Sequence, residues 1–136
     1  VEVRPTRGQI DDLIAEVNSP ALKACLDPPL LTEHTEAHYR AALQATGNLM
    51  VHSHFGGRFV RRADGSVAKW VDPRRPQGAD ERLFYRLAKD IINYQGHTGY
   101  ELCSPVLIGH RPSGLAYALE QAELAAKYMR DIVDAL

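Results

Sequence analysis

The chain has 136 residues, of which 45% are hydrophobic and 24% are charged, and its formal net charge is -1. This balance is typical of one globular domain with a real core, and it lacks the basic excess of a nucleic-acid-binding protein. No apolar run approaches the roughly 20 residues that span a bilayer, and two cysteines are too few for a disulfide framework. We therefore expect a cytoplasmic protein with neither a nucleic-acid nor a membrane partner.

In the first half of the chain, short apolar segments alternate with amphipathic ones. Strands are predicted over Val1–Arg4, Leu22–Leu26 and Leu49–His54, each stopped by prolines or glycines. The first predicted helix begins near Thr6, and its apolar positions recur at helical spacing: Ile10, Leu13, Ile14 and Val17. The second runs from Thr32 or Thr35 to Ala45, with Gly47 as its C-cap.

The second half begins with a predicted β-hairpin over Phe59–Val71, because Asp64-Gly65 is a strong turn signal between two apolar segments. A helix over Ala79–Asn93 and a strand over Thr98–Cys103 follow. The last helix is predicted to begin near Ser113. Its expected buried stripe consists of apolar residues spaced by three and four: Leu115, Leu119, Ala122, Ala126, Met129, Val133 and Leu136.

The order of these elements is β-α-β-α-β-hairpin-α-β-α, which predicts an α/β fold with parallel strands and right-handed crossovers. Two architectures fit the pattern, a four-stranded open sheet and half of a (β/α)8 barrel. A closed barrel is excluded by length, because it needs roughly 250 residues.

Polar residues at the carboxyl ends of parallel strands are the natural site candidates in this architecture. They are Glu2, Asp27, His52 or His54, and Glu101. Converging carboxylates would repel one another, and a divalent cation such as Mn²⁺, Mg²⁺, Co²⁺ or Zn²⁺ removes that conflict. Two plainer readings stay open, in which Glu2 is a solvated terminal residue and Asp27 is a turn residue.

His52 and His54 lie in one predicted strand, and we expect them to face opposite sides of the sheet, so that one of them is structural. Arginines surround the predicted hairpin, among them Arg58 and Arg61, and a substrate phosphate or carboxylate is a fitting partner for such side chains. The plainer reading of these arginines is a solvated, charged hairpin.

Several of these segments resemble the sugar-phosphate isomerase/epimerase superfamily, the xylose-isomerase-like TIM barrels. The stretch from Asn93 to Glu101 is similar to the family's G-Y-x-G-x-x-x-x-E segment, and Leu49–Gly56 resembles its h-x-H-x-H-h-G strand. Leu22–Asp27 looks like the h-x-h-x-L-D strand, and Val1-Glu2-Val3 resembles the strand with the first glutamate ligand. The resemblance covers essentially the whole chain.

This resemblance implies that residues 1–136 form one domain, the C-terminal half of such a barrel. It also implies a divalent metal held by four ligands: Glu2, Asp27, His54 and Glu101. Glu2 and Glu101 would act as acid and base in proton transfer next to the carbonyl of a sugar, a sugar phosphate or a related hydroxy-carbonyl compound. Substrate contacts would come from His52, Arg58 and Arg61.

The sequence departs from the family pattern at two places. Asp27 is followed by Pro28-Pro29-Leu30-Leu31, where many epimerases have a substrate-contacting His or Asn. Gly56-Gly57 replaces the acidic residue that usually follows the histidine strand. Both changes leave the metal ligands intact and fall at positions that bear on the substrate class.

A half-barrel has two open sheet edges, so we expect a homo-oligomer or a complementary N-terminal half-barrel as partner. The absence of an initiator Met before Val1 suggests preceding sequence. Alternatives to an active isomerase are an inactive half-barrel that dimerises, a fragment of a longer enzyme, an AP-endonuclease-like metal hydrolase, and a small α/β binding module.

Overall fold

A three-stranded parallel sheet lies at the centre of the computed structural model, which describes residues 7–71, 73–74, 78–102, 107–108, 111–112 and 114–136. Its strands are β1 (Ala24–Cys25), β2 (Met50–Gly56) and β5 (His97–Glu101), in the order β1-β2-β5. The predicted α/β class with parallel strands is therefore confirmed. The strand predicted over Val1–Arg4 lies outside the described residues, so the half-barrel remains a prediction.

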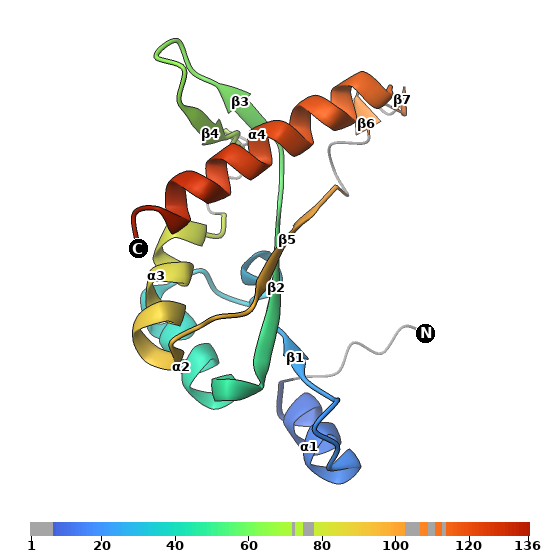
Figure 1. Cartoon of the computed structure of the whole chain (residues 1–136), viewed down its shortest axis with the longest axis vertical. Helices are drawn as coiled ribbons and strands as arrows, with labels where there is room; N and C mark the ends of the chain where they lie inside the picture. The colour runs from blue at the N-terminus through green and yellow to red at the C-terminus, as the bar shows by residue number, and fades with distance from the viewer. Residues whose placement is uncertain (1–6, 72, 75–77, 103–106, 109–110, 113) are drawn as a thin grey trace.

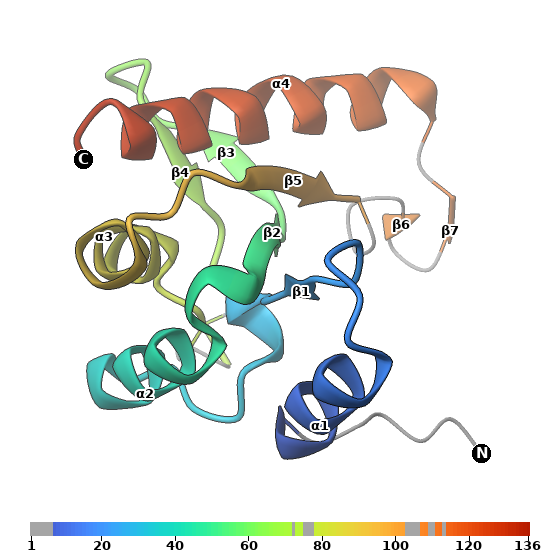
Figure 2. The same cartoon turned by 60° about the horizontal axis from the view of Figure 1, so that its bottom comes forward.

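Within the described residues, four α-helices accompany the sheet (Figures 1 and 2): α1 (Arg7–Val17), α2 (Glu36–Thr46), α3 (Glu81–Ile92) and α4 (Leu115–Val133). Two short 3-10 helices, η1 (Pro28–Leu30) and η2 (Gly47–Leu49), flank β1 and β2. Helix α2 begins and ends where the sequence predicts. Thr35 Oγ1 accepts a hydrogen bond from the backbone N–H of His38 at 3.2 Å, and Gly47 adopts a positive φ of 52° at the C-cap.

The predicted hairpin after β2 is also confirmed. It consists of β3 (Phe59–Arg61) and β4 (Val67–Lys69), antiparallel, with Gly65 at a φ of 81° in the turn. A second hairpin, β6 (Leu107–Ile108) with β7 (Arg111–Pro112), was not predicted. Its strands have two residues each, too few to produce the period-two pattern by which a strand is recognised.

The hydrophobic core lies between the helices and one face of the sheet. Ser53 and Phe55 of β2 are buried there, and Ser53 Oγ and Tyr85 Oη of α3 are 2.9 Å apart and share a hydrogen bond. Aromatic side chains from three elements meet in this core, with Tyr39 and Phe84 packed edge to face at 5.4 Å. These contacts anchor α2 and α3 beside the sheet (Figure 1).

Helix α4 is where the sequence predicts it, but the buried stripe expected for it is wrong. Leu115 and Leu119 are 75% and 56% exposed, and of the expected stripe only Met129 is buried. The residues that face the core are instead Gln121, Leu124, Ala125, Met129 and Ile132. The sequence does not predict this stripe because it contains the polar Gln121. The Gln121 side chain is buried because it forms hydrogen bonds with the backbone N–H and C=O of Phe59, at 2.8 and 3.1 Å.

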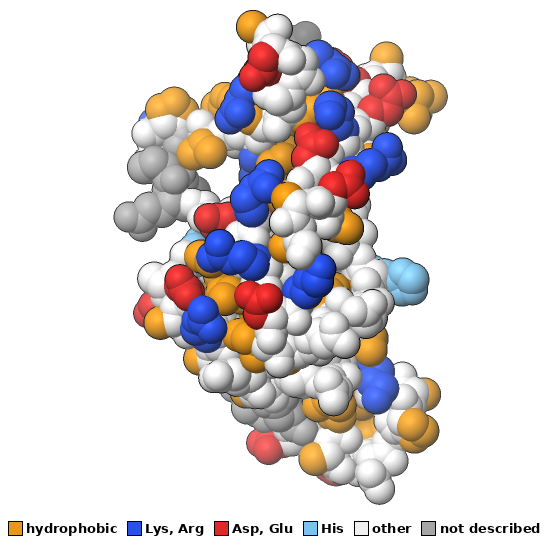
Figure 3. Space-filling model, turned by 60° about the vertical axis from the view of Figure 1, so that its left-hand side comes forward, with side chains coloured by type: hydrophobic (Ala, Val, Ile, Leu, Met, Phe, Trp, Pro, Cys, Tyr) orange, Lys and Arg blue, Asp and Glu red, His pale blue; other side chains and the backbone are white. Residues whose placement is uncertain are grey.

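The surface carries charges of both signs. Positive and negative side chains are interspersed over the face shown in Figure 3. None of the described helices combines the length and the apolar character needed to cross a bilayer.

Candidate functional site

The second face of the sheet is polar and more open than the core face. Along β2 the buried Ser53 and Phe55 alternate with the half-buried His52, His54 and Gly56. The two histidines therefore project from the same face, and the expectation that they face opposite sides is wrong. Side chains two residues apart on a strand point the same way, and the ring centroids of His52 and His54 lie only 4.5 Å apart.

The neighbouring strands add further polar side chains to this face. Cys25 of β1 pairs with His52, and Glu101 of β5 pairs with Gly56. Paired residues of adjacent parallel strands lie on the same face, so Cys25 and Glu101 flank the histidines. Asp27, two residues after Cys25, continues the row at the end of β1. The face thus collects thiol, carboxylate and imidazole groups from three strands.

Asp27 is the hub of the hydrogen bonds at this site. Its Oδ1 accepts the backbone N–H of His54 at 2.8 Å and the thiol of Cys25 at 3.3 Å. Its Oδ2 lies 3.3 Å from Nδ1 of the His54 ring. The carboxylate of Asp27 therefore fixes both the backbone of β2 at His54 and the orientation of the His54 imidazole. The interpretation of Asp27 as a turn residue alone is incomplete.

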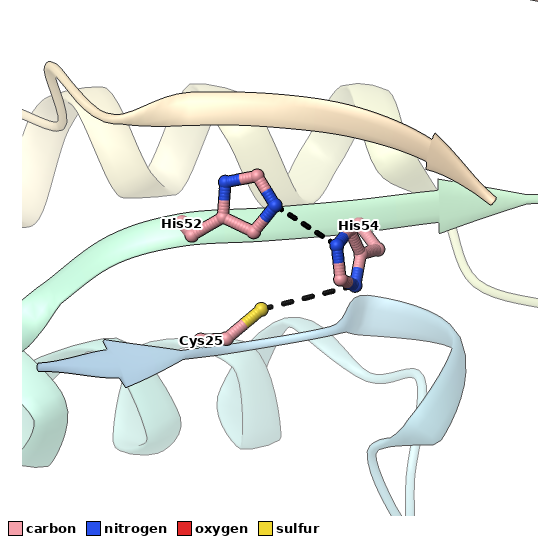
Figure 4. Close-up of side chains that lie close together, drawn as sticks. All are labelled: Cys25, His52 and His54. Carbon is pink, nitrogen blue, oxygen red and sulfur yellow. Dashed lines mark hydrogen bonds between the residues drawn. The ribbon is translucent and has the colours of Figure 1, made fainter.

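Cys25, His52 and His54 form a compact group (Figure 4). The Nε2 atoms of the two histidines are 2.9 Å apart, and Cys25 Sγ lies 3.9 Å from His54 Nδ1. The absence of a side chain at Gly99 allows this packing. A Cβ atom there would approach His54 Cδ2 to 3.0 Å and His52 Nε2 to 3.4 Å.

A cavity of about 310 Å³ opens at the carboxyl ends of the three strands. Asp27, His54 and Glu101, one residue from each strand end, line it. The cavity also contacts Lys69 of β4 and His34, which sequence reasoning had not placed at the site. Nε2 of His34 is buried and has no hydrogen-bond partner among the described residues.

The remaining predicted site residues lie elsewhere. Glu2 is outside the described residues. Arg58 and Arg61 are exposed and are absent from the described lining of the cavity, and the Arg58 guanidinium lies 5.8 Å from the centre of the Trp70 ring. The sequence does not predict Lys69 as a cavity residue, because its position there depends on how the β3–β4 hairpin packs beside the sheet. Gly57, whose added Cβ would meet Lys69 Cε, allows that close approach.

The surroundings of Cys25 disfavour its thiolate. Partial burial, the hydrogen bond to the Asp27 carboxylate and the negative charges of Asp27 and Glu101 together raise the pKa of this thiol to about 12. The Cys25 thiol of the metal-free protein is therefore protonated and poorly nucleophilic at neutral pH.

We expect iodoacetamide to alkylate Cys25 of chelator-treated protein roughly 100-fold or more slowly at pH 8 than an ordinary thiol. Asp27→Asn removes a charge and a hydrogen bond that raise the pKa, so this variant should react faster at the same pH. Peptide mass spectrometry, which separates Cys25 from Cys103, measures both rates. Equal rates in the two proteins would contradict the role assigned to Asp27.

The chain was compared with models of protein families, with curated proteins and with solved structures, and no match was found in any of the three.

Proposed function

We propose that the protein is a divalent-metal-dependent isomerase or epimerase, which moves a proton next to the carbonyl of a sugar, a sugar phosphate or a related hydroxy-carbonyl compound. The observation that carries this proposal is the meeting of Asp27, His54 and Glu101 at one cavity. Each residue comes from the carboxyl end of a different parallel strand, which is where α/β enzymes place their sites.

The donor atoms suit a divalent cation. Two neighbouring ligands of an octahedral cation, with bonds of about 2.1 Å, lie about 3 Å apart. Asp27 Oδ2 and His54 Nδ1 are separated by 3.3 Å, so only a small adjustment lets them share one ion. Glu101 lines the same cavity and must close on this pair to complete a mixed set of two carboxylates and one imidazole, which is a set that Mn²⁺, Mg²⁺, Co²⁺ or Zn²⁺ accepts.

A cation held by Asp27, His54 and Glu101 would stabilise the negative charge that develops on the substrate oxygen when the neighbouring carbon loses its proton. Glu101 is the base in this proposal, because its carboxylate stands at the end of β5 on the rim of the cavity. Return of the proton from Glu101 to the adjacent carbon, with the hydroxyl proton passing to the former carbonyl oxygen, gives an isomer. Donation of a different proton, carried by Glu2, to the opposite side of the original carbon gives an epimer, and this role of Glu2 rests on the family resemblance alone.

The cavity also offers cationic and neutral donors for the substrate. Lys69 Nζ is fixed by an ion pair with the buried Glu81, so its ammonium group occupies a defined position beside the cavity. We assign Lys69 to the binding of a substrate oxygen or phosphate, in preference to the more distant Arg58 and Arg61. His52 has a positioning role in this proposal, because its Nε2 atom contacts Nε2 of His54 at 2.9 Å.

The proposal includes a protein partner for the polar sheet face. Parallel sheets are normally covered on both faces, whereas the described part of the chain buries only the Ser53 and Phe55 face. The apolar side chains of Leu115 and Leu119 on α4 are also uncovered. A second copy of the chain or a complementary half-barrel would cover these surfaces and complete the site.

Glu101→Gln is the test of this function. Because the change removes one negative ligand and the proposed base, we expect Mn²⁺ affinity to fall roughly 10- to 100-fold and proton transfer to cease. Mn²⁺ binding is followed by electron paramagnetic resonance. Proton transfer is followed by the NMR signal lost as substrate C–H exchanges with D₂O, across a panel of aldoses, ketoses and their phosphates.

Glu123→Gln, an exposed change on α4, is the matched control and should leave both readouts unchanged. The proposal fails if the Mn²⁺-loaded wild-type protein, in any oligomeric state, exchanges no substrate proton. It also fails if Glu101→Gln exchanges at the wild-type rate.

A further inference from the structure

We propose that Cys25, His52 and His54 form a separate binding site for a thiophilic cation, with zinc as the best fit. One donor atom from each of the three side chains lies within 4.8 Å of the others. Thiolate and imidazole are the donors that zinc prefers, whereas the carboxylate-rich group at the cavity suits harder ions. The site has only His54 in common with that group, and its test does not depend on the isomerase proposal.

The hydrogen bond between Asp27 and the His54 ring orients this imidazole as a zinc ligand. Asp27 Oδ2 lies beside Nδ1 of His54, so the ring proton is held on Nδ1 and the lone pair is left on Nε2. That Nε2 atom points at Nε2 of His52, at 2.9 Å. A carboxylate that orients a histidine in this way is the usual second layer of a zinc site.

The distances are close to those of a tetrahedral zinc centre. With Zn–N bonds of about 2.0–2.1 Å and Zn–S bonds of about 2.3 Å, two nitrogens lie roughly 3.3 Å apart and sulfur roughly 3.6 Å from each. The two Nε2 atoms are therefore a few tenths of an ångström too close. The sulfur is less well placed, because Cys25 Sγ lies 3.9 Å from Nδ1 of His54, and rotation of its exposed side chain must bring it toward the two Nε2 atoms.

Binding converts the Cys25 thiol into a thiolate ligand and releases its proton to solvent. Three protein ligands leave the fourth position of the ion open to water or to a small molecule. The site shares His54 with the carboxylate group at the cavity. A neutral imidazole has one ring nitrogen with a free lone pair, so occupation of one site excludes the other.

Cobalt tests the site, because a Co²⁺–thiolate bond gives an intense near-ultraviolet absorption that oxygen and nitrogen ligands do not give. We expect the full-length protein to show this band with one equivalent of Co²⁺ and to lose it when Zn²⁺ is added. Cys25→Ala should abolish the band and weaken Zn²⁺ binding by at least about 100-fold. Cys103→Ala is the matched control and should retain both properties.

Glu101→Gln separates this site from the proposed catalytic one, because it should lower Mn²⁺ affinity and leave the cobalt–thiolate band intact. X-ray absorption of the zinc-loaded wild-type protein needs no variant, and one sulfur and two nitrogen neighbours are expected. Absence of the band from wild type overturns the site. So does its persistence in Cys25→Ala, or a zinc environment without sulfur.

Discussion

Replacing His54 by glutamine is expected to weaken binding of both Mn²⁺ and Zn²⁺ by at least about 100-fold each. The reason is that the imidazole belongs to both groups of donors, with Nδ1 beside Asp27 and Nε2 beside His52. Glutamine keeps a polar side chain of similar reach but has neither of the two imidazole nitrogens. Isothermal titration calorimetry with each metal measures the two affinities on the same protein.

His38→Gln is the control for this variant, since His38 lies on α2 away from the cavity and only its backbone N–H takes part in the helix cap. It should bind both metals as wild type does. If His54→Gln lost affinity for one metal alone, the two sites would not share this residue. Near-ultraviolet circular dichroism must show that the variant keeps its tertiary packing.

Replacing Lys69 by methionine is expected to lower the free energy of unfolding by about 3–5 kcal/mol. Lys69 Nζ forms an ion pair with Glu81, which is 1% exposed and also accepts a hydrogen bond from Tyr128 Oη at 3.3 Å. The substitution leaves a buried carboxylate without its counter-charge, whereas the methionine stem preserves most of the packing. Urea denaturation followed by tryptophan fluorescence measures the change.

The double variant Lys69→Met/Glu81→Leu should recover much of this loss, because it removes both charges together. Arg40→Ala is the surface comparison. It breaks an ion pair with Glu36 whose side chains are 48% and 50% exposed, and it should cost less than about 1 kcal/mol. Equal losses from Lys69→Met and Arg40→Ala would show that burial of Glu81 does not govern the effect.

The elements that the sequence predicts well are those with local signals. Thr35 and Gly47 bracket α2 because a side-chain cap and a positive φ are properties of a few neighbouring residues. Asp64-Gly65 likewise fixes the β3–β4 hairpin. The positions of Asp27, His54 and Glu101 at one edge of the sheet follow from the rule that parallel strands end together, and the structure does bring them to one cavity.

The features that were missed depend on contacts between distant segments. Gln121 can be buried because its side-chain amide forms hydrogen bonds with the backbone N–H and C=O of Phe59. A periodic sequence pattern cannot predict a partner that lies so far away in the chain. Lys69 and His34 reach the cavity through folding of the hairpin and of the segment after η1. The histidine faces were predictable, since strand geometry alone places His52 and His54 together.

Neighbouring residues of β2 from His52 to Gly56 are under different constraints, because alternate side chains face the core and the polar site. Ser53 and Phe55 are buried in the core, so most replacements there would destabilise the fold and be selected against. His52, His54 and Gly56 face the other way, and their replacement alters the chemistry of the site at little cost to folding. Related sequences could therefore diverge in activity at His52 and His54 while conserving Ser53 and Phe55.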